Sequence, residues 1–344
     1  MITIDGSFGE GGGQILRTSL ALAAITGQSV AIENIRANRP KPGLRPQHLT
    51  GALAVAEICS AELTGAKVDS TRLTFKPGPT RPGNYVFDVS KVRASAGSVN
   101  LVLQTVLWPL AMSGGRSRVT IKGGTHVPFA PTSNYIDDTF LPTVAAMGVR
   151  CHYSIKAAGY YPEGGGEVEV EVPAVDRVEP IDITAPERPF HARLTSAVSG
   201  LPTSIAERQL STAAARLKSA GLLSDEILTQ YPSRGKGTIV FISLTAGNAH
   251  AGFQSLGELK KRAEKVADEA CDELEAYLES GAAIDKHLAD QLIIPMALAD
   301  GASRFTTCEV TLHLLTNIAI VEQFLPVRFH VAGELGKPGM IERI

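Results

Sequence analysis

Residues 9–19 read GEGGGQILRTS, in which three consecutive glycines separate a carboxylate from an apolar segment that carries an arginine. A similar glycine-rich motif, PEGGGEVEVEV, recurs at residues 162–172. Two copies of such a word indicate an internal duplication, and therefore repeated structural units. Glycine has no Cβ, so backbone amides at a helix start can close around an anion there. A tight turn between a strand and a helix is the purely structural alternative.

Helix-like and strand-like segments alternate around these words. Helical periodicity is present at residues 14–25, 47–63, 98–112 and 133–148, and strand-like segments follow each of them. This rhythm predicts an α/β (α+β) fold whose large domain consists of repeated βα units, with sheets covered by helices.

The pattern changes between about Ile181 and Gly281, where strand-like residues 191–198 and 237–247 alternate with helical segments. We expect a small α+β domain at 181–281, inserted into a catalytic repeat domain formed by 1–180 and 282–344. Its last helix is predicted over 258–281 and is highly charged. Lys260 and Lys261 lie four and three residues before Glu264 there, a spacing typical of a solvated helix face.

Composition limits the function classes. The 344 residues carry a net charge of −2, so a nucleic acid could be bound only through a local basic patch. The four cysteines are too far apart for a zinc cluster or a compact disulfide framework. No signal peptide and no membrane span are expected, so we predict a cytoplasmic protein without a membrane partner.

A basic, proline-rich stretch at residues 34–48, NIRANRPKPGLRPQH, contains no acidic residue. Proline restricts the backbone, so these cations would lose little freedom on meeting an anion. Together with Arg17, they favour a phosphate-rich ligand, because guanidinium groups bind phosphate oxygens in pairs. Glu10 could help to hold a divalent metal that bridges phosphates, or it could simply favour a helix N-terminus. The cations of the stretch are Arg36, Arg39, Lys41 and Arg45.

His313 is the candidate nucleophile. The chain has neither a GxxxxGK[ST] phosphate loop nor a KxDG motif, so any nucleotide chemistry needs another attacking group. In residues 308–324, CEVTLHLLTNIAIVEQF, His313 falls where a strand pattern that extends to Leu312 gives way to a helix. The positive helix end disfavours imidazolium and leaves a neutral nitrogen that can attack phosphorus. A core or capping histidine is the alternative.

These words resemble the RNA 3'-terminal phosphate cyclases. The matching segments are GEGGGQILR, IRANRPKPGLRPQHL, LVLQTVL, YYPEGGG, HLADQLIIPMALA and HLLTNIAIVEQFLPVRF, in family order along essentially the whole chain. The resemblance implies that ATP and a divalent metal, Mg²⁺ or Mn²⁺, drive conversion of an RNA 3'-phosphate to a 2',3'-cyclic phosphate. It also implies a histidine-AMP intermediate at His313, followed by an RNA(3')pp(5')A intermediate.

The resemblance also assigns roles to other residues. It implies that Arg17, Arg36, Arg39 and His48 act with His313, and that Glu10 binds the metal. The implied ATP pocket consists of Gln104, Pro131, Phe253, His287, Leu288, Ala289, Asp290 and Gln291. Two positions depart from the family pattern, because His287 stands where tyrosine is expected and Asn134 stands in APTSNY where APxxDY is usual. The choice of ATP over GTP stays open for that reason.

Two other functions are compatible with part of this pattern. A catalytically inactive cyclase-like ribosome-assembly factor would keep the fold but lack the nucleophilic histidine. An enolpyruvyl transferase-like enzyme would share repeated α/β units and an arginine-rich site, but not the HLLTN word. The expected partners are ATP and an RNA with a 3'-phosphate end, and a homodimer is an open alternative to a monomer.

Overall fold

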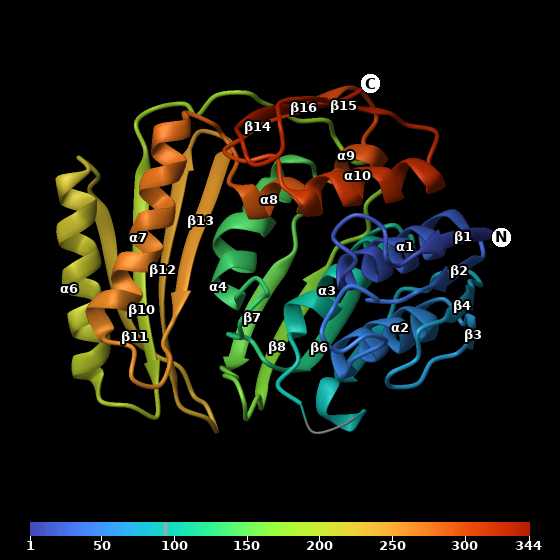
Figure 1. Cartoon of the computed structure of the whole chain (residues 1–344), viewed down its shortest axis with the longest axis horizontal. Helices are drawn as coiled ribbons and strands as arrows, with labels where there is room; N and C mark the ends of the chain where they lie inside the picture. The colour runs from blue at the N-terminus through green and yellow to red at the C-terminus, as the bar shows by residue number, and fades with distance from the viewer. Residues whose placement is uncertain (93–94) are drawn as a thin grey trace.

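The computed structural model describes residues 1–92 and 95–344, which form four four-stranded sheets (Figure 1). The first sheet has the order β1-β2-β4-β3. Its first pair is parallel and the other two pairs are antiparallel. Its strands are β1 (Ile2–Asp5), β2 (Val30–Glu33), β3 (Glu62–Thr64) and β4 (Leu73–Lys76).

Two further sheets repeat this topology. Their orders are β5-β6-β8-β7 and β9-β14-β16-β15, each again with one parallel pair followed by two antiparallel pairs. This repetition confirms the expected α/β (α+β) class with repeated units. The strands are β5 (Asn84–Asp88), β6 (Ser117–Gly123), β7 (His152–Ala157), β8 (Gly166–Val172), β9 (Asp182–Ile183), β14 (Ser303–Thr307), β15 (Phe329–Ala332) and β16 (Gly339–Arg343).

The two glycine words do not occupy equivalent places in these units. The first follows β1 and leads into a helix, whereas Gly164 and Gly165 form a left-handed turn, with φ of 65° and 73°, between β7 and β8. The prediction of repeated units was therefore right, but the second word is not the structural copy of the first. In chain order, the helix of the second unit that corresponds to the first helix begins at Val99.

Helices connect the strands, and those of different units pack on one another. Helix α1 contacts α2, α3 and α10, and it ends at the left-handed Gly27. The described residues contain no helix with both the length and the apolar character needed to cross a membrane. The helices of the three units are α1 (Gly13–Thr26), α2 (Pro46–Ile58), η1 (Val89–Lys91), α3 (Val99–Ala111), α4 (Ser133–Tyr135), η2 (Ile136–Phe140), α5 (Leu141–Ala146), α8 (Lys286–Gln291), α9 (Ile293–Leu298) and α10 (Leu312–Phe324).

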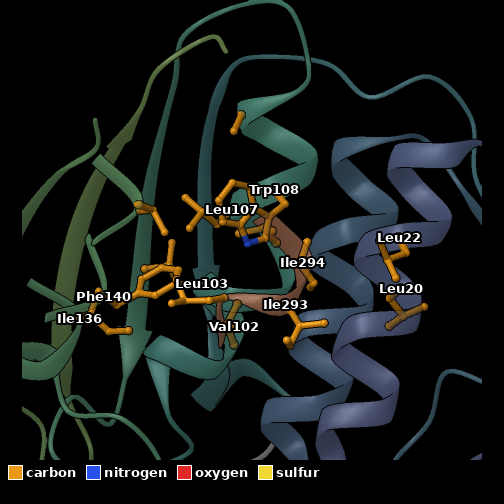
Figure 2. Close-up of a cluster of buried hydrophobic side chains, with 14 of the residues drawn as sticks. Leu20, Leu22, Val102, Leu103, Leu107, Trp108, Ile136, Phe140, Ile293 and Ile294 are labelled. Carbon is orange, nitrogen blue, oxygen red and sulfur yellow. The ribbon is translucent and has the colours of Figure 1, made fainter. Parts of the chain in front are cut away.

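The main core joins helices from all three units. Figure 2 shows side chains of α1, α3, η2 and α9 in one cluster, including Leu22, Trp108, Phe140 and Ile294. Burying each large apolar side chain contributes about 1.5–3 kcal/mol relative to leaving it exposed. This packing fixes the position of α1 relative to the C-terminal helices.

The fourth sheet has the order β11-β10-β12-β13 and interrupts the third unit between β9 and α8. Helices α6 and α7 cover one face (Figure 1), and the apolar cluster beneath them is separate from the main core. On the other face, Phe241 meets Tyr135 edge to face. The elements are β10 (His191–Ser199), α6 (Thr203–Ser219), β11 (Ser224–Gln230), β12 (Gly237–Ala246), β13 (Ala249–Leu256) and α7 (Ala263–Ser280).

The domain boundaries at 1–180, 181–281 and 282–344 stay a prediction. Asp182 and Ile183, which fall just inside the middle range, pair with β14 of the third unit.

Two local predictions were wrong. The strand before His313 ends at Thr307, well short of Leu312, and Thr311 caps α10. Helix α7 begins only at Ala263, so Lys260 and Lys261 precede it and do not pair along it with Glu264.

Candidate active site

The first glycine word forms a turn that packs against the start of α10. Gly9 and Gly11 have left-handed φ of 56° and 60°, which glycine adopts without strain. A Cβ at Gly9 would lie 2.2 Å from Thr316 Oγ1, and a Cβ at Gly12 would lie 2.2 Å from the Glu10 carboxylate. The glycines therefore let the turn approach α10 while Glu10 folds back over the start of α1.

The start of α1 has free backbone donors. Within the described residues, no side chain caps this helix at Gly12. The amides of a first helical turn have no partner inside the helix, and the helix dipole favours negative charge beside them. The turn can therefore bind an anion such as phosphate.

His313 lies in the first turn of α10, directly opposite that turn. The hydroxyl of Thr311 caps the helix by accepting from Leu314 N at 3.1 Å. His313 Nδ1 lies 2.8 Å from Gln14 Oε1 and 3.3 Å from Glu10 Oε1, while 52% of the side chain remains exposed. The ring is thus held on one side and open to solvent on the other.

The environment of His313 favours the neutral imidazole. Burial lowers its pKa from the ordinary 6.5. Glu10 opposes the shift, and the guanidinium groups of Arg17 and Arg39 add to it. A neutral ring nitrogen keeps the lone pair that a nucleophile needs.

A buried polar network fixes the helices around this ring. Gln14 Nε2 donates to Asp290 Oδ2 at 2.5 Å, Asn317 Nδ2 donates to the Asp290 carbonyl at 2.6 Å, and Thr18 Oγ1 donates to Asn317 Oδ1 at 2.6 Å. These bonds join α1, α8 and α10. Burial raises the pKa of Asp290 to about 7, against the lowering effect of Arg17.

The basic loop lies beside Glu10. Arg39 forms an ion pair with the Glu10 carboxylate, whose side chain is only 6% exposed. Arg36 donates through Nη1 to the carbonyls of Lys41 at 2.6 Å and Gly43 at 3.0 Å, so its guanidinium also stabilises its own loop.

His48 and Arg17 meet at Gly13. A Cβ at Gly13 would lie 2.3 Å from His48 Nε2 and 3.3 Å from Arg17 Nη1, so glycine leaves room for both side chains. Burial and the charges of Arg36, Arg17 and Arg45 hold the pKa of His48 well below its usual value. The Arg45 amide donates to His48 Nδ1 at 3.2 Å, so in the neutral ring Nε2 carries the proton, on the side that faces Gly13.

The residues predicted to form the nucleotide pocket differ in their exposure to solvent. Gln104 Nε2 donates to Gln291 Oε1 at 2.8 Å, and Gln291 Nε2 donates to the His287 carbonyl at 2.7 Å. Pro131 is half-buried, and its carbonyl accepts from Asn100. Leu288 and Ala289 have no exposed surface, and their side chains pack in the main core.

Phe253 forms part of a pocket of about 270 Å³ that His287 also lines. The phenyl ring is 3% exposed and packs against Tyr277 with ring centroids 5.3 Å apart. Asp285 lines the same pocket, caps α8 at His287 N and Leu288 N, and also accepts from Tyr135 Oη at 2.9 Å and Gly252 N at 3.1 Å. It therefore connects α8 to the strand that carries Phe253.

The sequence analysis missed three polar residues of this site: Gln14, Asn317 and Asp285. Gln14 lies one helical turn before Arg17, and Asn317 one turn after His313, so helical spacing could have identified both. Asp285 lies outside the glycine-rich motif, the basic stretch and the segment around His313. Its carboxylate reaches Tyr135 only in the folded chain, so no sequence pattern pointed to it.

The described residues contain no group of three or more His, Cys, Asp or Glu side chains that could hold a metal ion. Glu10 is nonetheless suited to a magnesium-type ion, which is often held by one carboxylate together with substrate phosphates. Its carboxylate lies beside the glycine turn and His313.

Comparison with known proteins gives a consistent result. A model of the family described as RNA 3'-terminal phosphate cyclase matches residues 8–331. The chain is 44% identical over 327 residues to a protein named RNA 3'-terminal phosphate cyclase from Trichormus variabilis, covering 94% of each. It is 45% identical over 336 residues to a protein of the same name from Methylococcus capsulatus, covering 94% of this chain and 91% of that one.

One solved structure, the enolpyruvyl transferase NikO from Streptomyces tendae, aligns over 99% of this chain and 48% of its own. The TM-score is 0.38 and the sequence identity 11%, which are too low to support a conclusion about fold or function.

Proposed function

The chain belongs to the RNA 3'-terminal phosphate cyclase family, and from this we propose that it uses ATP to convert an RNA 3'-phosphate to a 2',3'-cyclic phosphate at the site around His313. The observation that carries this proposal is a neutral imidazole, half exposed, opposite a glycine-rich helix start and flanked by arginines. Such a site can attack phosphorus and accommodate the phosphate oxygens at once.

The reaction proceeds in three steps. An imidazole nitrogen of His313 forms a bond to the α-phosphorus of ATP as the bond to pyrophosphate breaks. An oxygen of the RNA 3'-phosphate then takes the AMP group from the histidine. The neighbouring 2'-hydroxyl finally attacks the 3'-phosphorus, loses its proton and displaces AMP. AMP is needed because an unmodified phosphate has no good leaving group, whereas the 2'-hydroxyl is already within reach.

The remaining residues would stabilise the negative charge of the phosphate groups. Arg17 and Arg39 lie close enough to His313 to lower its pKa, so they can also stabilise phosphate oxygens beside it. His48 faces the same glycine turn with a protonated Nε2 and can donate a hydrogen bond without adding a charge. Arg36 would act mainly through the loop that carries Arg39.

Glu10 would hold the divalent metal, which supplies charge neutralisation between phosphates when bound. A metal ion at Glu10 would compete with Arg39 for the carboxylate, because both are positively charged. We propose that the base and ribose of ATP lie near His287, Phe253, Gln104 and Gln291. An imidazole at His287 can stack on a base as a tyrosine ring would.

The test is self-labelling with ATP that carries radioactive phosphorus at the α position, in the presence of Mg²⁺ or Mn²⁺. The wild type should form an acid-labile, alkali-stable adduct, and His313→Ala should abolish it. His330→Ala is the matched control, because His330 is an exposed histidine on β15. Adding an oligoribonucleotide with a 3'-phosphate should remove the label from the protein and leave a cyclic end on the RNA.

Folded wild type that never takes up the label would overturn the proposed reaction. It would favour the assembly-factor function, which needs the RNA surface but no nucleophile. A cytoplasmic location and a homodimer stay predictions from the sequence.

A further inference from the structure

The two nitrogens of the His313 ring have different surroundings. Nδ1 faces two oxygen atoms, Gln14 Oε1 at 2.8 Å and Glu10 Oε1 at 3.3 Å. Oxygen atoms of an amide and a carboxylate accept hydrogen bonds and do not donate them. A neutral ring in this position must therefore carry its proton on Nδ1, which leaves the lone pair on Nε2.

The orientation of the Gln14 amide is fixed from its other end. Its Nε2 lies 2.5 Å from Asp290 Oδ2. Above its pKa of about 7, Asp290 is ionised and only accepts, so at such pH the nitrogen of the amide faces Asp290 and the oxygen faces His313. Asp290 is held in turn by the bond from Asn317 to its carbonyl. The tautomer of the ring is thus determined by a chain of contacts that runs through α8 and α1.

We propose that Gln14 is a positioning residue for the nucleophile: it holds His313 in the tautomer protonated at Nδ1, so that Nε2 attacks the α-phosphorus. This inference rests on the proposed function and adds to it the residue that holds the ring in the reactive tautomer. A histidine of the wrong tautomer presents a proton where the lone pair is needed, and such an error can cost a triad enzyme about 10⁴-fold in rate.

Glu10 cannot perform this task alone. Its contact with Nδ1 is the longer of the two, and its carboxylate also binds Arg39. A negative charge beside an imidazole favours its doubly protonated form. Gln14 is uncharged, so it can fix the tautomer while the ring stays neutral.

The first measurement is nitrogen NMR on protein labelled with ¹⁵N in histidine. The His313 signals are identified by their absence from His313→Ala. We expect a protonated Nδ1 and an unprotonated Nε2 in the wild type. A wild type protonated at Nε2 overturns the proposal without any further variant, and this outcome is independent of whether the protein labels itself with AMP.

The second measurement uses Gln14→Met, which keeps the length and helix propensity of glutamine but removes its acceptor. The His313 signals should become those of a tautomer mixture. The rate constant of self-adenylylation should fall at least about tenfold, as expected for loss of one oriented hydrogen bond, while the ATP concentration at half-maximal rate stays within about twofold. Gln14→Leu serves as the second variant if Gln14→Met does not fold.

Gln28→Leu is the matched control. Gln28 also bonds from the α1 side to α10, because its Nε2 donates to the Phe324 carbonyl at 2.9 Å, but at the far end of that helix. It should leave both the His313 signals and the rate unchanged. If Gln14→Met folds, keeps the wild-type tautomer and labels at the wild-type rate, Gln14 does not position the nucleophile.

Discussion

Helices α1 and α10 pack together, and so do helices α6 and α7, but the polar contacts that join each pair differ in burial. Between α1 and α10, Thr18 and Asn317 are 4% and 3% exposed and share a hydrogen bond of 2.6 Å. Between α6 and α7, Arg208 binds both carboxylate oxygens of Glu264 at 2.8 Å on the protein surface.

The comparison separates two uses of polar residues in helix packing. A buried polar group costs free energy unless it is paired, so each member of the α1–α10 network depends on the others. An exposed ion pair exchanges one hydrated arrangement for another and contributes about 0–1 kcal/mol. Only the first kind of contact can place the His313 ring accurately, because the alternative arrangements of a buried polar network are costly.

The substitution Asn317→Leu should have the largest effect on stability and tests the contrast between buried and exposed contacts. It leaves the Thr18 hydroxyl and the Asp290 carbonyl without a partner. Since each orphaned buried group costs about 1–3 kcal/mol, we expect a loss of about 2–5 kcal/mol in the free energy of unfolding. Denaturant unfolding measures it, and self-adenylylation should fall in parallel because Asp290 and Gln14 lose their positions.

Gln323→Leu is the control for this change. Gln323 is an exposed amide on the same helix and donates to the Ala319 carbonyl of its own turn. A surface substitution of this kind should change stability by less than about 0.5 kcal/mol. Equal effects of the two variants would mean that burial does not distinguish the contacts.

The charged pattern of the α7 segment shows what helical spacing can and cannot predict. It identified a solvated face, and α7 is indeed exposed along one side. It assigned the partners wrongly: Glu264 pairs with Arg208 of α6, and Lys261 reaches Glu269 at 2.5 Å from the loop before the helix. Local spacing indicates which side chains face water, but the partner is decided by whichever helix packs alongside.

The same limit applies to the strands. The sequence pattern predicts a strand over Arg304–Leu312, yet pairing with β16 stops at Thr307. Thr307 lies opposite Gly339, the first residue of β16, so the residues after Thr307 have no partner in that strand. Strands β11 and β13 were missed altogether. In β11 every residue is exposed or half-buried, so no period of two is visible in its sequence.

The next prediction concerns Arg39→Ala, which breaks the ion pair with Glu10. We expect RNA cyclisation to fall about 100-fold, the loss typical of removing one donor that stabilises charge in a transition state. Self-adenylylation of His313 should fall less, because Arg17 and the helix start remain beside the nucleotide. Single-turnover assays with labelled ATP and with 3'-phosphorylated RNA measure the two steps separately.

Arg208→Ala is the counterpart in the α6–α7 pair and also breaks an arginine–glutamate bond. It should leave both steps unchanged. Equal losses in adenylylation and cyclisation for Arg39→Ala would instead assign Arg39 to the nucleotide or to the loop structure.

The site residues that could be predicted lie in short motifs of distinctive composition: the glycine-rich motif, the basic stretch and the segment around His313. Glu10, Arg17, Arg39, His48 and His313 lie together around the glycine turn, and their roles stay predictions. Gln14 escaped notice because a glutamine at the start of an apolar helix looks like any polar helix residue. Its role depends on contacts with Asp290 and His313, which are brought to it only by packing of the third unit on the first.

The smallest effect is expected for Arg216→Ala. Arg216 is the most connected cation between α6 and α7, with Asp272 and Glu275 each at 2.7 Å. Its side chain is 26% exposed and the two carboxylates are 57% and 45% exposed, so water already solvates the charges. We expect a loss of no more than about 1 kcal/mol, smaller still in concentrated salt, and unchanged labelling of His313. A loss of unfolding free energy as large as that of Asn317→Leu would mean that water does not solvate this ion-pair network. The two helix pairs would then differ in the kinds of polar groups that join them and not in how deeply those groups are buried.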